Sequence, residues 1–174
     1  MLIVQKFGGS SIADGDRLRR AAGICMRQRQ NGNEVVVVVS AMGDTTDLLA
    51  DRARVLGGKP SPREMDALIT TGEQQSAALL VMTMESLGMP AVSLAGWQAG
   101  IYTDCRYGDS DIRLIAPVRI REALSRGRVP VVTGFQGVCA AGDITSLGRG
   151  GSDTTAVALA AALESDCCEI YTDV

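Results

Sequence analysis

The fold is decided by residues 2–40, which read LIVQKFGGSSIADGDRLRRAAGICMRQRQNGNEVVVVVS. Leu2–Phe7 is a short apolar run, and Val35–Val39 is five consecutive β-branched residues, which is typical of a strand covered on both faces. Between them, apolar residues recur at helical spacing over residues 14–30, and an Asn-Gly-Asn turn ends the predicted helix. The stretch therefore predicts a strand, a helix and a second strand parallel to the first, a βαβ unit.

The remaining sequence alternates between helical and strand-like segments. Helices are expected over Thr45–Leu56, Arg63–Leu87 (with a break near residues 70–72), Pro117–Arg126 and Asp153–Leu163. Strands are expected over Ala91–Leu94, Ile112–Ala116, Val129–Thr133 and Cys168–Val174, with a loop or hairpin over residues 96–110 and a hairpin over residues 137–146. This alternation predicts an α/β protein with a mainly parallel central sheet and helices on both faces.

Composition excludes several classes of protein. The chain has 174 residues, 46% of them hydrophobic and 21% charged, which excludes disorder as the main state. A net charge of −3 and 3% aromatic residues argue against a nucleic-acid partner. The absence of histidine excludes Ser-His-Asp and Cys-His catalysis, and we expect no protein-bound metal site.

Cysteine usage and the N-terminus indicate the compartment. The five cysteines are odd in number and contain no Cys-x-x-Cys pair, which favours buried thiols in a reducing cytosol. Residues 1–6 begin with a short apolar run that no basic region precedes, and no apolar stretch is long enough to span a bilayer. We therefore expect a cytoplasmic protein without a membrane partner.

A lysine and a glycine pair follow the first strand. Gly8 and Gly9 allow the backbone to approach an anion closely, and Lys6 adds a positive charge beside them. On its own, a glycine pair after a strand is more often a plain tight turn. The stretch matches neither the Rossmann fingerprint nor the Walker A loop.

A second glycine cluster is more specific. Residues 148–155 read GRGGSDTT and lead into an alanine-rich helix, so their N–H groups lie where anions bind. Arg149 can hold a carboxylate with two hydrogen bonds. A simpler alternative makes Ser152 or Asp153 a helix N-cap, but it leaves the arginine among the glycines unexplained.

Two further polar residues occupy informative positions. Ser40 ends the valine strand, and ligands of open α/β sheets bind beyond the carboxyl ends of strands. Glu73 interrupts a helical stretch, where it either pairs with an ammonium group of a ligand or is simply solvated. Phosphoryl transfer to a carboxylate needs no base, which suits a chain without histidine.

Six motifs, in this order along the chain, resemble those of the aspartokinases. They are KFGGSS at residues 6–11, VSAM at 39–42, TGE at 71–73, GFQG at 134–137, LGRGGSDTT at 147–155 and EIYTDV at 169–174. The resemblance implies a three-layer α/β/α sandwich of the amino-acid kinase type. It also implies transfer of phosphate from ATP, with Mg²⁺, to the β-carboxylate of L-aspartate, the first step of lysine, threonine and methionine biosynthesis.

The resemblance also implies a role for individual residues. The residues implied to be catalytic are Lys6, which would neutralise the transferring phosphoryl group, and Asp153, which would organise Lys6. The residues implied to bind the nucleotide are Lys6, Gly8, Gly9, Ser10, Thr172 and Asp173. The residues implied to bind aspartate are Ser40, Thr46, Glu73, Arg149 and Ser152.

The resemblance departs from the family at the end of the sequence. The family's Thr-Asp-Val motif continues into nucleotide-contacting residues and then into ACT domains, whereas this sequence ends at Val174. We therefore expect residues 1–174 to be the substrate-side portion of one kinase domain, with the fold incomplete at its C-terminal side. Alternatives are a catalytically incomplete binding or structural piece, and a kinase for glutamate, acetylglutamate, carbamate or UMP. A homo-oligomer is compatible with either.

Overall fold

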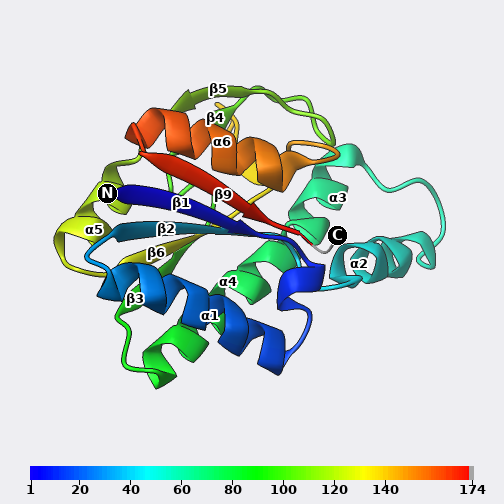
Figure 1. Ribbon diagram of the computed structural model, residues 1–174. Coiled ribbons are helices and arrows are strands. Elements are labelled where there is room, and N and C mark those ends of the chain that lie inside the picture. Colours follow the sequence, from blue (N-terminus) through cyan, green and yellow to red (C-terminus); the bar gives the residue numbers. More distant parts are fainter. Residues whose placement is uncertain (173–174) are drawn as a thin grey trace.

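A five-stranded parallel sheet forms the centre of the computed structural model, which describes residues 1–172 (Figure 1). The strands lie in the order β3-β6-β2-β1-β9, and each neighbouring pair is parallel. Their bounds are Leu2–Phe7 for β1, Glu34–Val39 for β2, Ala91–Leu94 for β3, Val129–Thr133 for β6 and Cys167–Tyr171 for β9.

The valine strand β2 lies in the middle of this sheet. Val35–Val39 are all fully buried, because helices cover both faces of the strand. On one side β2 pairs with β1 from Leu2 to Phe7, and on the other it pairs with β6. The predicted βαβ unit is therefore confirmed, and it forms the centre of the sheet.

Helices cover both faces of the sheet and complete the predicted three-layer sandwich (Figure 1). One face packs against α1 (Gly15–Gln30) and α4 (Thr71–Ser86) through a core that includes Phe7. The other face packs against α5 (Val118–Ser125) and α6 (Gly151–Leu163).

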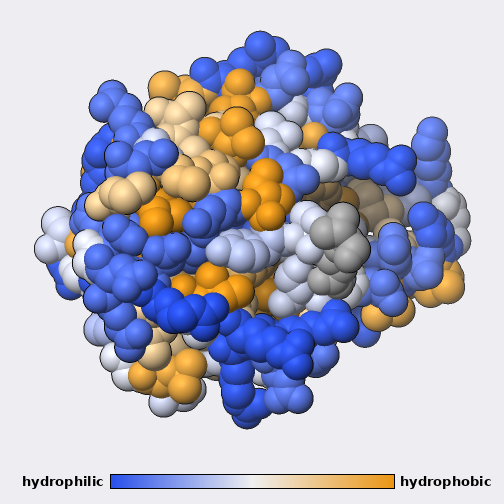
Figure 2. Space-filling model, in the orientation of Figure 1, coloured by the Kyte–Doolittle hydropathy of each residue, from blue (hydrophilic) through white to orange (hydrophobic). Residues whose placement is uncertain are grey.

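Local sequence explains where the helices begin. The Asp14 carboxylate caps α1 by accepting from the Arg17 N–H at 2.8 Å, and the outer face of α1 is hydrophilic (Figure 2). Helix α3 (Pro62–Ile69) begins after Ser61, whose hydroxyl accepts from the Glu64 N–H, with proline at its first position. The predicted break near residues 70–72 is the junction between α3 and α4.

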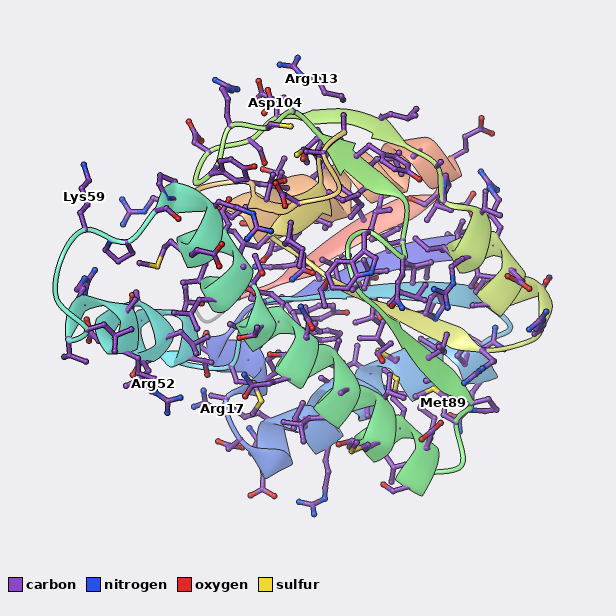
Figure 3. All side chains as sticks on the ribbon, turned by 180° about the vertical axis from the view of Figure 1, so that it is seen from behind. Arg17, Arg52, Lys59, Met89, Asp104 and Arg113 are labelled. Atoms are coloured by element: carbon purple, nitrogen blue, oxygen red, sulfur yellow. The ribbon has the colours of Figure 1, made fainter. Side chains whose placement is uncertain are left out.

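A second, four-stranded sheet lies outside the sandwich in the order β5-β4-β7-β8. Its strands are Ile101–Thr103 (β4), Ile112–Ile115 (β5), Gln136–Val138 (β7) and Ile144–Ser146 (β8). The sequence predicts the β7–β8 hairpin but not its union with β4 and β5, which depends on one bridge between Tyr102 and Val138. Asp104 and Arg113, labelled in Figure 3, pair beside this sheet at 2.7 Å.

Several element ends differ from the expectation. Helix α6 begins at Gly151 rather than Asp153, and α2 (Thr45–Arg54) ends before Leu56. A short 3₁₀ helix follows the first glycine pair, over Ser10–Ile12. Residues 173–174 of the last predicted strand lie outside the described residues. Within residues 1–172, none of the helices is both long and apolar enough to cross a membrane.

Candidate active site

The carboxyl ends of β1, β2 and β6 open into a cavity of about 400 Å³. In a parallel sheet these ends meet at one edge, so residues far apart in the sequence come together there. The cavity is lined by Lys6, Gly9, Ser10, Ser40, Ala41, Gly43, Thr46, Glu73, Phe135 and residues 148–153.

Lys6 and Asp153 form an ion pair at the floor of this cavity. Lys6 is the penultimate residue of β1 and is only 6% exposed. Its Nζ lies 2.7 Å from Oδ1 of Asp153, which belongs to the first turn of α6. Burial of an ammonium group is costly unless it is paired, so Asp153 stabilises the charge of Lys6 beneath the cavity.

In the loop after β1, position 9 has room only for glycine. A Cβ on Gly9 would lie 2.4 Å from the carbonyl oxygen of Ala41, because the two loops after β1 and β2 touch there. The Gly9 carbonyl also accepts the N–H of Gly43 at 3.0 Å. The glycine pair is therefore more than a plain tight turn, since it lets the backbone line the cavity beside Lys6.

The N-terminus of α6 is free to bind an anion. Gly150 is the N-cap, with φ of 75°, and no side chain caps the helix, so neither Ser152 nor Asp153 is the cap. Within residues 1–172, the N–H groups of Gly150 and Ser152 have no hydrogen-bond acceptor. Unpaired N–H groups at a helix N-terminus are a natural site for phosphate or carboxylate.

Glu73 is a buried carboxylate at the start of α4. It is 3% exposed, and its Oε1 accepts the N–H of Ala41 at 3.2 Å. Burial raises its pKa to about 7, although backbone N–H groups lower the pKa in part. Its Oε2 is buried and has no partner among the described residues. An unpaired carboxylate oxygen in a cavity wall suits a cationic group of a ligand.

Arg149 lies on the exposed loop before α6. Within the described part of the chain no acceptor or carboxylate pairs with its guanidinium, although the residue lines the cavity. The planar guanidinium can hold a carboxylate or phosphate with two parallel hydrogen bonds. The cavity thus offers the Lys6 ammonium group and two sets of backbone N–H groups to a phosphate. It offers the Glu73 carboxylate and the Arg149 guanidinium to a small zwitterion.

Most residues singled out in the sequence meet in this cavity. Of the others, Gly8 does not line the cavity, although a Cβ added to it would lie 3.6 Å from Nζ of Lys6. Thr172 lines a separate cavity of about 300 Å³ with Phe7 and Tyr171. Asp173 lies outside the described residues.

Six lining residues are not among the site residues predicted from the sequence, namely Ala41, Gly43, Phe135, Gly148, Gly150 and Gly151. Phe135 has φ of 70°, which is rare for a residue other than glycine, and its N–H donates to Thr155 Oγ1 at 3.1 Å. The motifs at residues 39–42, 134–137 and 147–155 contain five of the six, and this is the signal in the sequence that points to them.

Comparison with known proteins assigns the family. The sequence profile described as the amino acid kinase family matches residues 1–174. The chain belongs to the amino acid kinase family. Among characterised members, it is 56% identical over 174 residues to the aspartokinase of Mycolicibacterium smegmatis and 55% identical over 173 residues to that of Geobacillus stearothermophilus. Each alignment covers 99% of this chain but only 41% and 42% of those proteins, respectively.

Solved structures of this family have the same fold. The aspartate kinase of Synechocystis superposes with a TM-score of 0.85 and 49% identity, over 100% of this chain and 29% of that one. Aspartokinase III of E. coli, in complex with aspartate and ADP, superposes with a TM-score of 0.89 and 26% identity, over 100% of this chain and 49% of that one. The expected amino-acid kinase fold is therefore confirmed.

Proposed function

We propose that the protein transfers the γ-phosphoryl group of ATP to the β-carboxylate of L-aspartate, giving aspartyl phosphate. This reaction opens the biosynthesis of lysine, threonine and methionine. The observation that carries the proposal is the meeting of unpaired Glu73 Oε2, unpaired Arg149 and the Lys6 ammonium at one cavity. The names of the relatives support it, although the chain spans only about two fifths of their length.

Aspartate fits the cavity by charge. Its ammonium group would pair with Glu73, and its α-carboxylate would take both hydrogen bonds of Arg149. The β-carboxylate would then point toward Lys6. Three hydroxyl-bearing residues of the lining would complete the substrate contacts, namely Ser40, Thr46 and Ser152.

The chemistry requires positioning and charge neutralisation rather than a base. An oxygen of the ionised β-carboxylate attacks the γ-phosphorus, the bond from phosphorus to the bridging oxygen breaks, and ADP leaves with the electron pair. Lys6 stabilises the negative charge that spreads over the phosphoryl oxygens. Asp153 acts through Lys6, because it holds the ammonium group at this point.

Nucleotide phosphates fit the two glycine loops. The backbone of Gly9 and Ser10 on one side and the start of α6 on the other provide N–H groups around Lys6. The N–H of the adjacent Gly8 donates to the carbonyl of Tyr171 at 3.1 Å, so Gly8 would contribute by letting the loop approach the phosphates closely. That E. coli aspartokinase III has been solved with ADP supports nucleotide use here. Thr172 and Asp173 are proposed to continue the nucleotide site.

Magnesium fits this site only together with ATP. Within residues 1–172, no group of three or more acidic, cysteine or histidine side chains could hold a metal ion. Mg²⁺ commonly binds through substrate phosphates and one or two carboxylates, and Asp153, which is half exposed at the cavity, is suited to be such a carboxylate. Bound there, the ion would neutralise phosphate charge.

We also place the protein in the cytoplasm, where its five free thiols remain reduced.

An assay of ADP release with several acceptors tests the proposal. The purified protein is given Mg-ATP with L-aspartate, L-glutamate, N-acetylglutamate, carbamate or UMP in parallel. We expect ADP release to depend on aspartate and to be far slower with every other acceptor. Equal or faster release with another acceptor, or none with aspartate, would contradict the assignment.

A further inference from the structure

Asp66 is a buried carboxylate that the proposed chemistry does not use. It lies on α3, is 1% exposed and does not line the cavity. Its Oδ2 accepts the N–H groups of Gly108 and Ser146, each at 2.9 Å, and its Oδ1 accepts the hydroxyl of Ser146 at 2.7 Å. A buried carboxylate is stable only when such donors surround it, so this cluster has a defined geometry.

The side chain of Asp66 fixes the strand that leads to Arg149. Ser146 is the last residue of β8, and the chain reaches Arg149 three residues later. Between them, the N–H of Leu147 donates to the carbonyl of Phe135 at 2.8 Å, so the backbone of this short connection is restrained. The position of the Arg149 loop therefore follows from the hydrogen bonds at Ser146.

The backbone of the same residue fixes the helix end that leads to Glu73. The carbonyl of Asp66 accepts the N–H of Thr70 at 3.2 Å and its hydroxyl at 2.7 Å. The carbonyl of Thr70 in turn accepts from Gln136 Nε2 at 2.8 Å. Helix α4 begins at the next residue, and Glu73 lies in its first turn.

We propose that Asp66 is a positioning residue that sets the separation between Glu73 and Arg149, and so determines affinity for the amino-acid end of aspartate. The inference rests on the proposed function, because it takes those two residues as the partners of the ammonium and α-carboxylate groups. It assigns Asp66 no contact with the substrate.

The expected effect is confined to one of the two substrates. Without the carboxylate, the N–H and hydroxyl groups of Ser146 lose their buried acceptor, and the loop toward Arg149 moves relative to Glu73. A displacement of about 1 Å within a site can lower the reaction rate by up to roughly 10²-fold. Lys6 and Gly9 belong to β1 and its loop, which Asp66 does not touch, and the Lys6–Asp153 ion pair holds the start of α6, so we expect ATP binding to be unaffected.

Two substitutions at Asp66 separate positioning from charge. Asp66→Ala removes all three acceptor contacts. Asp66→Asn keeps an oxygen that can accept both N–H groups, and its amide can donate to Ser146 Oγ. We expect Asp66→Ala to raise the KM for aspartate roughly tenfold or more and to leave the KM for ATP unchanged. In Asp66→Asn, the KM for aspartate should stay within about threefold of the wild-type value.

A matched control comes from the neighbouring residue on β8. Thr145 is fully buried, and its hydroxyl contacts that of Thr103 at 2.6 Å within the second sheet, without reaching α3. Thr145→Val therefore perturbs the same strand and should leave the KM for aspartate unchanged. If Asp66→Ala does not fold, Ser146→Ala, which removes one of the three contacts, should give a smaller rise of the same kind.

The outcomes distinguish this inference from the proposed function. Aspartate-dependent ADP release by the wild-type protein is the reference, and its absence would refute the proposed function itself. With an active wild type, an unchanged KM for aspartate in Asp66→Ala or Ser146→Ala would overturn the positioning role. An equal rise for ATP and aspartate, or the same rise in Thr145→Val, would also overturn it.

Discussion

Lys6 Nζ and Asp153 Oδ1 lie 2.7 Å apart, and this ion pair joins the end of β1 to the start of α6. It places two segments that are distant in the sequence around one buried ammonium group, and each has backbone N–H groups with no acceptor among residues 1–172. Under the proposed function, such a site would be prepared for the charge of the transferring phosphoryl group before any substrate arrives.

Replacement of Lys6 by alanine should lower kcat far more than it changes the KM for aspartate. Loss of one group that stabilises transition-state charge typically costs on the order of 10²–10³ in rate. Steady-state kinetics with both substrates measure this. The chain's other lysine, Lys59, points away from the body of the protein on the loop before α3 (Figure 3), so Lys59→Ala is the control. A near-normal kcat in Lys6→Ala would remove Lys6 from the mechanism.

Arg149→Lys should not behave as a conservative change. An ammonium group cannot form the two parallel hydrogen bonds of a guanidinium, so we expect aspartate affinity to fall about tenfold or more while ATP affinity changes little. Calorimetric titration with each ligand measures both. Arg126→Lys, in a surface pair with Glu122, is the matched control. Loss of ATP affinity instead would assign Arg149 to the phosphates.

The ligand-free protein should lose stability as pH rises from about 4.5 to about 7. Burial raises the pKa of Glu73 from its ordinary 4.5 to about 7, so the folded protein holds a proton that the unfolded chain has released. Stability from this group is therefore complete below pH 4.5 and is lost as pH rises through 7. Urea unfolding at several pH values measures the slope.

Glu73→Gln provides the comparison for that slope, because glutamine fills the same space without titrating. We expect the variant to lack the part of the pH dependence between about 4.5 and 7 and to bind aspartate more weakly. A slope that is identical in both proteins would show that another group titrates in this range.

Gly9→Ala should weaken both the fold and ATP binding. The added methyl group would lie 2.4 Å from the Ala41 carbonyl, so the loops after β1 and β2 must separate. Overpacking of this kind costs about 1–3 kcal/mol, which urea denaturation detects. In Gly15→Ala, the nearest atom to the new Cβ is the end of the flexible Arg19 side chain at 3.8 Å, and its stability should be unchanged or higher. Equal stability of the two variants would contradict the predicted contact.

Much of the fold follows from local sequence. The valine run of β2 and the helical spacing of α1 predict the βαβ unit, since hydrophobic periodicity reports directly which faces are buried. The second sheet as a whole does not follow, because β4, β7 and β8 have three residues each and β4 pairs with β7 across a long stretch of sequence. Strands this short carry too little pattern to be paired in advance.

The sequence predicts most residues of the candidate site, but it does not predict how deeply they are buried or what they pack against. The glycine motifs indicated where anions bind, and Glu73 was balanced between a ligand partner and a solvated residue. Its burial decides between these readings, and burial depends on the close packing of α4 against the loop at Ala41. No local pattern in the sequence reports that packing, nor the network at Asp66.

The most direct test of the central claim identifies the phosphorylated product. The protein is incubated with Mg-ATP and L-aspartate, and ³¹P NMR spectra are recorded before and after hydroxylamine is added. We expect ADP together with an acyl phosphate signal that hydroxylamine removes, with aspartyl hydroxamate formed in its place. Release of inorganic phosphate alone, at a rate that aspartate does not change, would contradict it.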